Sequence, residues 1–209
     1  MSQVSLVHRT EGAEDLIVYM ARVSNPSSQK ENKNGERLLK YLIKHKHWSP
    51  FEMASMCVEI ETTRSISSQL LRHRSFSYQE YSQRYAAVLD KPVTPNLRRQ
   101  DVKNRQNSID DLDPFLKQNL QLNSQRLFTQ AHLLYEEMLE HGVAKECARE
   151  VLPLASRTRL YMHGTLRSWI HYIDVRASVE TQLEHRQIAE EIKRIMYEQF
   201  PTISAAAFD

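Results

Sequence analysis

The sequence predicts a single α+β domain over residues 1–209, with a small antiparallel or mixed sheet flanked by long helices. Two observations lead to this class. Apolar residues recur with a period of two in some segments, as in half-buried strands, and at spacings of three and four in others, as in amphipathic helices. The two kinds of segment do not alternate regularly, which argues against a parallel βαβ sheet. A chain of 209 residues is long enough to bury one sizeable core.

Strands are expected where short apolar runs alternate with polar residues. The clearest runs over 54–61, where every second residue is apolar and one buried face results. Weaker alternation predicts three further strands, at 4–6, 85–88 and 156–162.

Helices are expected where apolar residues recur every three or four positions. The longest, over 115–141, carries a stripe that predicts either a core contact or a subunit interface. The stripe consists of Leu116, Leu120, Leu127, Ala131, Leu134 and Met138. The other expected helices run over 15–23, 35–45, 63–71, 144–151, 165–173 and 182–199.

Two segments show no regular period. Residues 26–34 are polar and are expected to form a loop. Residues 90–114 are rich in charges and contain Pro92 and Pro95, so a flexible loop is expected there. A patternless stretch of this length inside a compact domain is unusual, and three interpretations stay open: a mobile loop, an active-site cover or a solvated surface excursion.

Composition excludes several classes of protein. The net charge of +2 is too small to indicate a DNA-binding or membrane-surface protein. No apolar run approaches the roughly 20 residues of a membrane helix, and the start of the chain lacks the pattern of a signal peptide. The two cysteines indicate neither a disulfide framework nor a metal site, so we expect a cytoplasmic protein without a metal. With four glycines and no glycine-rich phosphate motif, any nucleotide must be held by side chains and helix ends.

The most informative stretch begins with Arg72-His73-Arg74 and continues through seven residues, SFSYQEY, to Ser82. It combines basic side chains with several hydroxyls and one carboxylate, Glu80. Guanidinium groups bind phosphate through paired donors, and hydroxyls and carboxylates can recognise sugar or base edges. The stretch therefore suits a small anionic ligand.

This pattern resembles the signature of flavin-dependent thymidylate synthases. Four further segments resemble motifs of that family in the same order along the chain. They are ARVS at 21–24, HWSPFE at 47–52, CAREVLP at 147–153 and GTLRSWIHYIDVR at 164–176. Many members have a histidine after the glutamate of the second motif; this chain has Met53, so no role is carried to that position.

The resemblance implies a homotetramer with FAD and substrates between subunits. Members of the family transfer a one-carbon unit from 5,10-methylenetetrahydrofolate to C5 of dUMP. NADPH reduces the FAD, and the products are dTMP and tetrahydrofolate. No DNA, RNA or membrane is expected as a partner.

The resemblance also implies site residues. The FAD contacts are Ser24, His47, Ser49, Arg72, His73, Arg74, Glu80, Thr165, Leu166, Arg167 and His171. The dUMP contacts are Gln69, Arg72, Glu80, Ser82, Gln83, Arg84, Arg149 and Arg176, with Arg84 and Arg149 on the phosphate. Arg176 is the expected catalytic residue, because a guanidinium near the uracil ring favours its ionised, nucleophilic form.

A cysteine nucleophile is not expected. Cys57 lies in an alternating strand and Cys147 in a helix, and both are interpreted as small buried hydrophobic residues. The sequence therefore favours a route in which the reduced flavin does the redox work and the protein supplies position and charge. Two other hypotheses stay open: a nucleic-acid-binding helical module that uses the RHR region with Arg98-Arg99, and a non-enzymatic scaffold built on the helix at 115–141.

Overall fold

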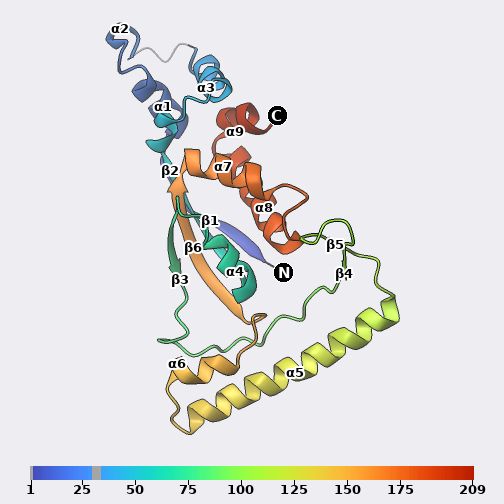
Figure 1. The fold of residues 1–209 in the computed structure, drawn as a ribbon. Helices are drawn as coiled ribbons and strands as arrows, with labels where there is room; N and C mark the ends of the chain where they lie inside the picture. The colour runs from blue at the N-terminus through green and yellow to red at the C-terminus, as the bar shows by residue number, and fades with distance from the viewer. Residues whose placement is uncertain (1, 30–33) are drawn as a thin grey trace.

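The computed structural model describes residues 2–29 and 34–209. Its centre is a four-stranded sheet with the order β1-β2-β6-β3, in which all neighbouring strands run antiparallel (Figure 1). The strands are β1 (Gln3–Arg9), β2 (Ser55–Thr63), β6 (Arg157–Thr165) and β3 (Ser77–Glu80). The expected α+β class with a small antiparallel sheet is confirmed.

The two central strands, β2 and β6, pair along their full nine-residue lengths. Alternation gives the pair one apolar and one polar face. Met56, Ile60 and Leu160 are completely buried on the first face, whereas Glu59 and Arg159 lie on the other and are at least partly exposed. The chain's own helices therefore cover only the apolar face.

Three helices form that cover: α4 (Arg64–Leu70), α7 (Leu166–Arg176) and α8 (Leu183–Gln199) (Figure 1). Trp169 of α7 is completely buried, and its indole N–H donates to the carbonyl of Met56 at 3.0 Å. This bond and the apolar contacts around it hold α7 against the sheet. Arg176, in the last turn of α7, is positioned by the same packing.

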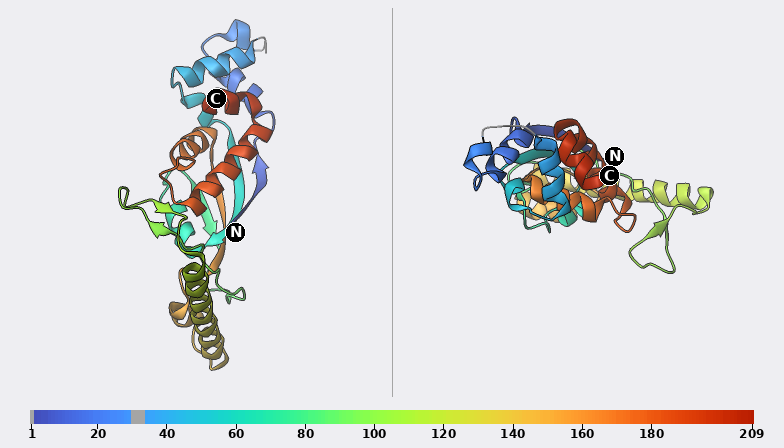
Figure 2. Two further views of the ribbon diagram at one scale, coloured as in Figure 1. Left: turned by 90° about the vertical axis from the view of Figure 1, so that its right-hand side faces the viewer. Right: turned by 90° about the horizontal axis from the view of Figure 1, so that it is seen from above.

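The other helices lie in two groups at opposite ends of the sheet (Figures 1 and 2). The first group lies at the end where α7 begins, with α3 packed on α1 and α9. It consists of α1 (Ala13–Ala21), α2 (Pro26–Gln29), α3 (Gly35–Lys44), the 3-10 helix η1 (Ser49–Glu52) and α9 (Pro201–Phe208). The second group consists of α5 (Pro114–Glu140), α6 (Lys145–Ala148) and the 3-10 helix η2 (Arg149–Val151).

The 27-residue helix α5 is attached to the domain through a small separate core. Tyr135 packs with Val88 and Ala148, and its hydroxyl accepts the Val88 N–H at 3.0 Å. Most of the apolar stripe of α5 lies outside this core: Leu120 and Leu127 are 42% and 62% exposed, whereas Met138 packs against it. A core contact within this chain is therefore found at Met138 but not at the four leucines of the stripe, for which a subunit interface stays a prediction.

Several local expectations need correction. Residues 85–88 are not a strand, because Val88 packs against Tyr135 and not on the sheet. The fourth strand is β3, which carries only one apolar residue, Tyr78, and so has almost no strand pattern. Helices α2 and α9 were not expected; α2 occupies the first part of the loop expected at 26–34, of which 30–33 lie outside the described residues. The segment 90–114 contains a small hairpin, β4 (Arg99–Gln100) with β5 (Ser108–Ile109).

Within the described residues, no helix combines the length and the apolar character that crossing a membrane requires.

Candidate functional site

Arg176 and His73 form a hydrogen-bonded pair at the C-terminal ends of α7 and α4. The Arg176 Nε–H donates to His73 Nε2 at 2.9 Å, so this ring nitrogen must be unprotonated. Burial, followed by the proximity of Arg176 and His171, lowers the pKa of His73 to about 4. The imidazole is therefore neutral at pH 7 and acts as an acceptor that orients the guanidinium.

Two completely buried side chains stand behind this pair. The Tyr172 ring packs edge-on against His73, and its hydroxyl lies 3.1 Å from His185 Nε2. The other nitrogen of His185, Nδ1, lies 3.2 Å from Gln69 Oε1. Burial, followed by the electrostatic interactions with Arg176 and His73, lowers the pKa of His185 to about 3, and burial raises the pKa of Tyr172. Both groups are neutral at pH 7 and act only through hydrogen bonds.

Sequence reasoning missed Tyr172 and His185. A signal for His185 exists, because it is spaced three and seven residues from Ile188 and Ile192 and so lies on the buried stripe of α8. A histidine at such a position needs hydrogen-bond partners within the core.

A cavity of about 810 Å³ opens between η1 and the N-terminal turn of α7. Among its lining residues are Trp48, Glu52, Thr165, Arg167 and His171. Thr165 is the N-cap of α7, with its Oγ1 accepting the Ser168 N–H at 3.3 Å, and Arg167 pairs with Glu52. The helix N-terminus and the guanidinium favour a negatively charged group, and the indole of Trp48 offers apolar surface. These residues fit a large cofactor that has both anionic and aromatic parts.

Ser82 and Arg84 lie elsewhere, beside a depression of about 410 Å³ that Lys145 and Glu146 also line. Arg84 donates from Nε to Glu146 at 3.2 Å and pairs with it through Nη2 at 3.1 Å. This depression shares no lining residue with the cavity at α7.

Two expected dUMP contacts have a buried donor without a hydrogen-bond partner among the described residues, namely Gln83 Nε2 and Arg149 Nε. The carboxylate of Glu150 lies 3.5 Å from Arg149 Nε. Buried polar atoms of folded proteins are normally bonded. Donors of this kind indicate where a ligand or another chain can complete the structure.

Glu80, the last residue of β3, is bound by side chains of two other elements, α4 and β6. Its carboxylate accepts from Ser67 Oγ at 2.5 Å and Thr158 Oγ1 at 2.9 Å, and Arg64 lies at 2.7 Å. The expected ligand-binding carboxylate thus also cross-links β3 to α4 and β6.

The remaining expected cofactor contacts do not lie together in the chain. Arg72 and Arg74 are exposed after α4, and His47 and Ser49 are exposed beside η1. Ser24 lines a different cavity, of about 610 Å³, between α1 and α3. Leu166 is completely buried, and its N–H donates to the carbonyl of Ala54 at 2.9 Å. Its expected contact with FAD stays a prediction.

The two cysteines differ in exposure. Cys57 is buried, and burial raises the pKa of its thiol, which makes it a poor nucleophile. Cys147 is exposed, so the expectation that both are buried is wrong. In the short helix α6 only Ala148 faces the core.

Comparison with known proteins decides which family carries this arrangement. The sequence profile of the family described as "Thymidylate synthase complementing protein" matches residues 5–202. The chain belongs to this family.

Relatives within the thymidylate synthase complementing protein family match the chain over nearly its whole length. A flavin-dependent thymidylate synthase from Synechocystis is 51% identical over 193 residues, which cover 92% of this chain and 88% of the relative. A probable flavin-dependent thymidylate synthase from Paramecium bursaria Chlorella virus 1 is 49% identical over 201 residues, covering 96% and 93%.

A solved structure extends the likeness to the fold. The crystal structure of a UMP/dUMP methylase from Streptomyces cacaoi, bound with 5-Br dUMP, is 27% identical and superposes with a TM-score of 0.85. The superposition covers 99% of this chain and 94% of that chain.

Proposed function

We propose that the chain is a flavin-dependent thymidylate synthase. It converts dUMP to dTMP with 5,10-methylenetetrahydrofolate as the carbon donor and NADPH as the reductant of bound FAD. The observation that carries the proposal is the Arg176–His73 pair, which joins the two most specific motifs of the sequence in one partly buried hydrogen bond. The names of the Synechocystis and Chlorella virus relatives and of the S. cacaoi methylase support it.

FAD is assigned to the cavity at the N-terminus of α7. Thr165, Arg167 and His171 line it, and the backbone N–H groups of the first turn of α7 point toward this end of the helix. When bound, FAD carries reducing equivalents from NADPH to the one-carbon unit. Arg167 can exchange Glu52 for an anionic part of the cofactor, because their ion pair is about half exposed and such pairs contribute little.

Arg176 is assigned to the uracil ring. Its Nε is already bonded to His73, so the two terminal nitrogens are the donors that face other partners. A fixed positive charge beside the ring stabilises negative charge on it and so makes C5 a better nucleophile. A neutral His73 accepts a hydrogen bond from Arg176 and adds no charge of its own. A protonated His73 would repel the guanidinium and displace it.

The phosphate of dUMP is assigned to Arg84 and Arg149, beside Ser82. Among the described residues, Arg84 is held only by Glu146, and both side chains are more than half exposed, at 66% and 55%. Such a pair is worth about 0–1 kcal/mol, whereas a guanidinium–phosphate pair is charge-assisted and bidentate. The phosphate can therefore displace Glu146.

We further propose a homotetramer whose copies share the active sites. The Arg84 depression adjoins α6, before β6, and the Arg167 cavity adjoins the start of α7, after β6. The ends of a nine-residue strand are roughly 25 Å apart, too far for one substrate and one flavin ring to meet within a single copy. The exposed leucines of α5 and the uncovered face of the sheet offer surfaces on which copies can assemble.

A direct test is the visible spectrum of protein purified without added cofactor and again after FAD reconstitution. A bound flavin is expected, and a protein without a flavin signal in both preparations contradicts the proposal. The reducing cytoplasm is the proposed compartment.

The nucleic-acid hypothesis gains no support from the structure. Arg98 and Arg99 are paired with Glu184 and Asp111, and His73 is bonded to Arg176. The scaffold hypothesis rests on the stripe of α5 alone. A colourless protein that binds neither FAD nor dUMP would favour it.

A further inference from the structure

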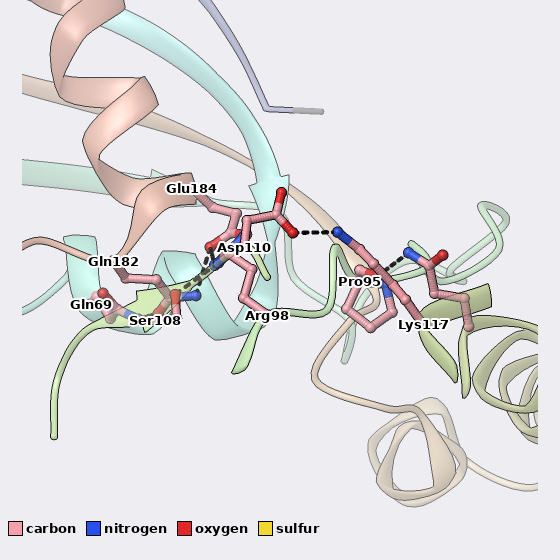
Figure 3. Close-up of polar contacts among 9 residues, drawn as sticks. Gln69, Pro95, Arg98, Ser108, Asp110, Lys117, Gln182 and Glu184 are labelled. Carbon is pink, nitrogen blue, oxygen red and sulfur yellow. Dashed lines mark hydrogen bonds and ion pairs between the residues drawn. The ribbon is translucent and has the colours of Figure 1, made fainter. Parts of the chain in front are cut away.

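The hairpin β4–β5 is joined to the start of α8 by a bidentate ion pair (Figure 3). Arg98, which directly precedes β4, donates from Nη1 and Nη2 to the two carboxylate oxygens of Glu184, at 2.7 and 3.0 Å. Its Nε–H donates to Ser108 Oγ of β5 at 2.8 Å. The Arg98 side chain is only 10% exposed, so this pair is far better shielded from water than the surface pairs of the chain.

Two carboxamides continue the chain of hydrogen bonds from Glu184. Gln182 Nε2 donates to Glu184 Oε2 at 2.9 Å, and Gln69 Nε2 donates to Gln182 Oε1 at 2.7 Å. Gln69 Oε1 then lies 3.2 Å from His185 Nδ1. The connected residues, which we call the Arg98–Gln69 relay, are Arg98, Glu184, Gln182 and Gln69.

The ionised carboxylate sets the direction of every bond in the relay. Burial opposes ionisation of Glu184, but hydrogen bonds from Arg98 and Gln182 outweigh it and hold its pKa below the ordinary value. An ionised carboxylate only accepts, so Gln182 must turn its amide nitrogen toward Glu184 and its oxygen toward Gln69.

The same logic continues past Gln182. Gln69 must present its nitrogen to Gln182, so its oxygen faces His185. His185 must then carry its proton on Nδ1, and its Nε2 accepts from the Tyr172 hydroxyl. A flipped Gln69 would place two donors or two acceptors face to face at both contacts.

The hairpin that supplies Arg98 is itself held on both sides. Lys117 of α5 pairs with Asp110 at 2.6 Å, and Gln121 Nε2 donates to the Pro95 carbonyl at 3.1 Å (Figure 3). The segment thus connects α5, at one end of the molecule, with α8 and Gln69.

We propose that Arg98 is a positioning residue for dUMP, which acts through Glu184 and Gln182 to fix the orientation of the Gln69 carboxamide. The inference rests on the proposed function, in which Gln69 contacts dUMP. With one N–H and one oxygen lone pair of Gln69 committed to the relay and to His185, one N–H and one lone pair remain for the substrate. Substrate then meets an amide whose orientation is already set, and no free energy is lost in ordering it.

The same hairpin provides a matched control. Arg99 also makes a bidentate ion pair, with Asp111 at 2.8 and 2.5 Å, but this pair is about 42–45% exposed and contacts no member of the relay. If Arg98 only anchored the hairpin, Arg98→Ala and Arg99→Ala would both lower stability. The two variants would then have the same affinity for dUMP.

The experiment measures the dissociation constant of dUMP, and the kcat and KM for dUMP, in FAD-loaded protein. Arg98→Ala is expected to weaken dUMP binding at least about 5-fold with an unchanged flavin spectrum, and Arg99→Ala to change it less than about 2-fold. Arg98→Lys keeps an ion pair with Glu184 and should recover part of the affinity. Glu184→Gln replaces the carboxylate with an amide that can also donate, so the carboxamides of Gln182 and Gln69 are free to adopt the opposite orientation. This variant should weaken dUMP binding although the hairpin stays folded.

A double-mutant cycle decides whether the effect passes through Gln69. In a Gln69→Ala background, Arg98→Ala should weaken dUMP binding no further. An undiminished effect there, or equal effects of Arg98→Ala and Arg99→Ala, overturns the relay while the parent enzyme still makes dTMP. A parent that loads FAD but binds no dUMP and makes no dTMP instead overturns the proposed function.

Discussion

Arg176 and Arg84 are both assigned to dUMP, yet their surroundings differ. Arg176 leaves a buried helix and is held at Nε by a neutral histidine, with Tyr172 and His185 packed behind it. Arg84 lies in a loop, and a single surface carboxylate, Glu146, holds it. The first arginine is preorganised by the core, as electrostatic stabilisation of a transition state requires. The second can adapt, as suits a group that captures a mobile phosphate.

The largest effect is expected for Arg176→Ala. Flavin reduction by NADPH should persist, because the cavity at α7 is unchanged, whereas dTMP formation should fall at least about 100-fold, the scale of one lost transition-state contact. Both rates are measured on one preparation. If dTMP formation stays within a few-fold of the parent, the activating group must be sought among Arg74, Arg84 and Arg149.

A smaller effect is expected for Arg84→Ala. Loss of one charge-assisted contact to phosphate should raise the KM for dUMP about 10-fold and change kcat much less. Glu146→Ala, which removes only the surface partner, should leave KM within about 2-fold. Steady-state kinetics over a range of dUMP concentrations test both variants. If Arg84→Ala lowered kcat without changing KM, Arg84 would act in the chemical step, as proposed for Arg176, and not in binding the phosphate.

The buried His185 and the partly buried His73 predict a dependence of stability on pH. Above pH 6.5 His185 is neutral in the folded and unfolded chains, so it contributes no slope. As the pH falls from 6.5 toward about 3, the unfolded chain binds a proton that the folded chain excludes, so stability falls. One such histidine gives a slope of about 1.4 kcal/mol per pH unit. His73 adds to it down to about pH 4.

Urea unfolding between pH 7 and 4.5 measures this slope, and His185→Gln should reduce it. The same change at the exposed His141 controls for the loss of an imidazole as such. A slope that His185→Gln leaves unaltered would show that acid unfolding is governed by other groups. The interpretation of His185 as a buried, neutral histidine behind Arg176 would then be contradicted.

The smallest effect is expected for the double replacement of Cys57 and Cys147 by alanine. dTMP formation should stay within a few-fold of the parent, because the proposed chemistry uses no thiol nucleophile. The exposure of Cys147 makes this test necessary, since burial does not exclude it from reaction. A modest loss of stability, ~1 kcal/mol, is compatible with small changes at Cys57. Lost turnover in a folded, FAD-bound variant would indicate a thiol mechanism.

Local patterns predicted the helices that carry the site, but not the contacts between distant segments. Trp169, Ile170 and Ile173 placed α7 and hence Arg176, because apolar periodicity reports burial directly. The strand β3 escaped notice because an edge strand with one apolar residue has no alternation to detect. The four leucines of the α5 stripe are exposed in this chain, so the burial that their periodicity predicts requires a contact with another copy.

The relay illustrates the limit more sharply. Gln69 and His185 are 116 positions apart, and Arg98 and Glu184 are 86 apart. Taken alone, each is a polar or charged residue of a kind that is common on the solvent-exposed surface of proteins. Only the fold, which brings the hairpin against the start of α8, turns them into one connected set.

The central claim is the methylation of dUMP by a flavin-bearing protein, and the formation of dTMP tests it most directly. Purified protein is incubated with dUMP, 5,10-methylenetetrahydrofolate and NADPH, with and without FAD, and dTMP is quantified by chromatography. The account predicts dTMP in the complete mixture and none when FAD is removed or the folate is omitted. A folded protein that holds FAD, oxidises NADPH and yet makes no dTMP would contradict it.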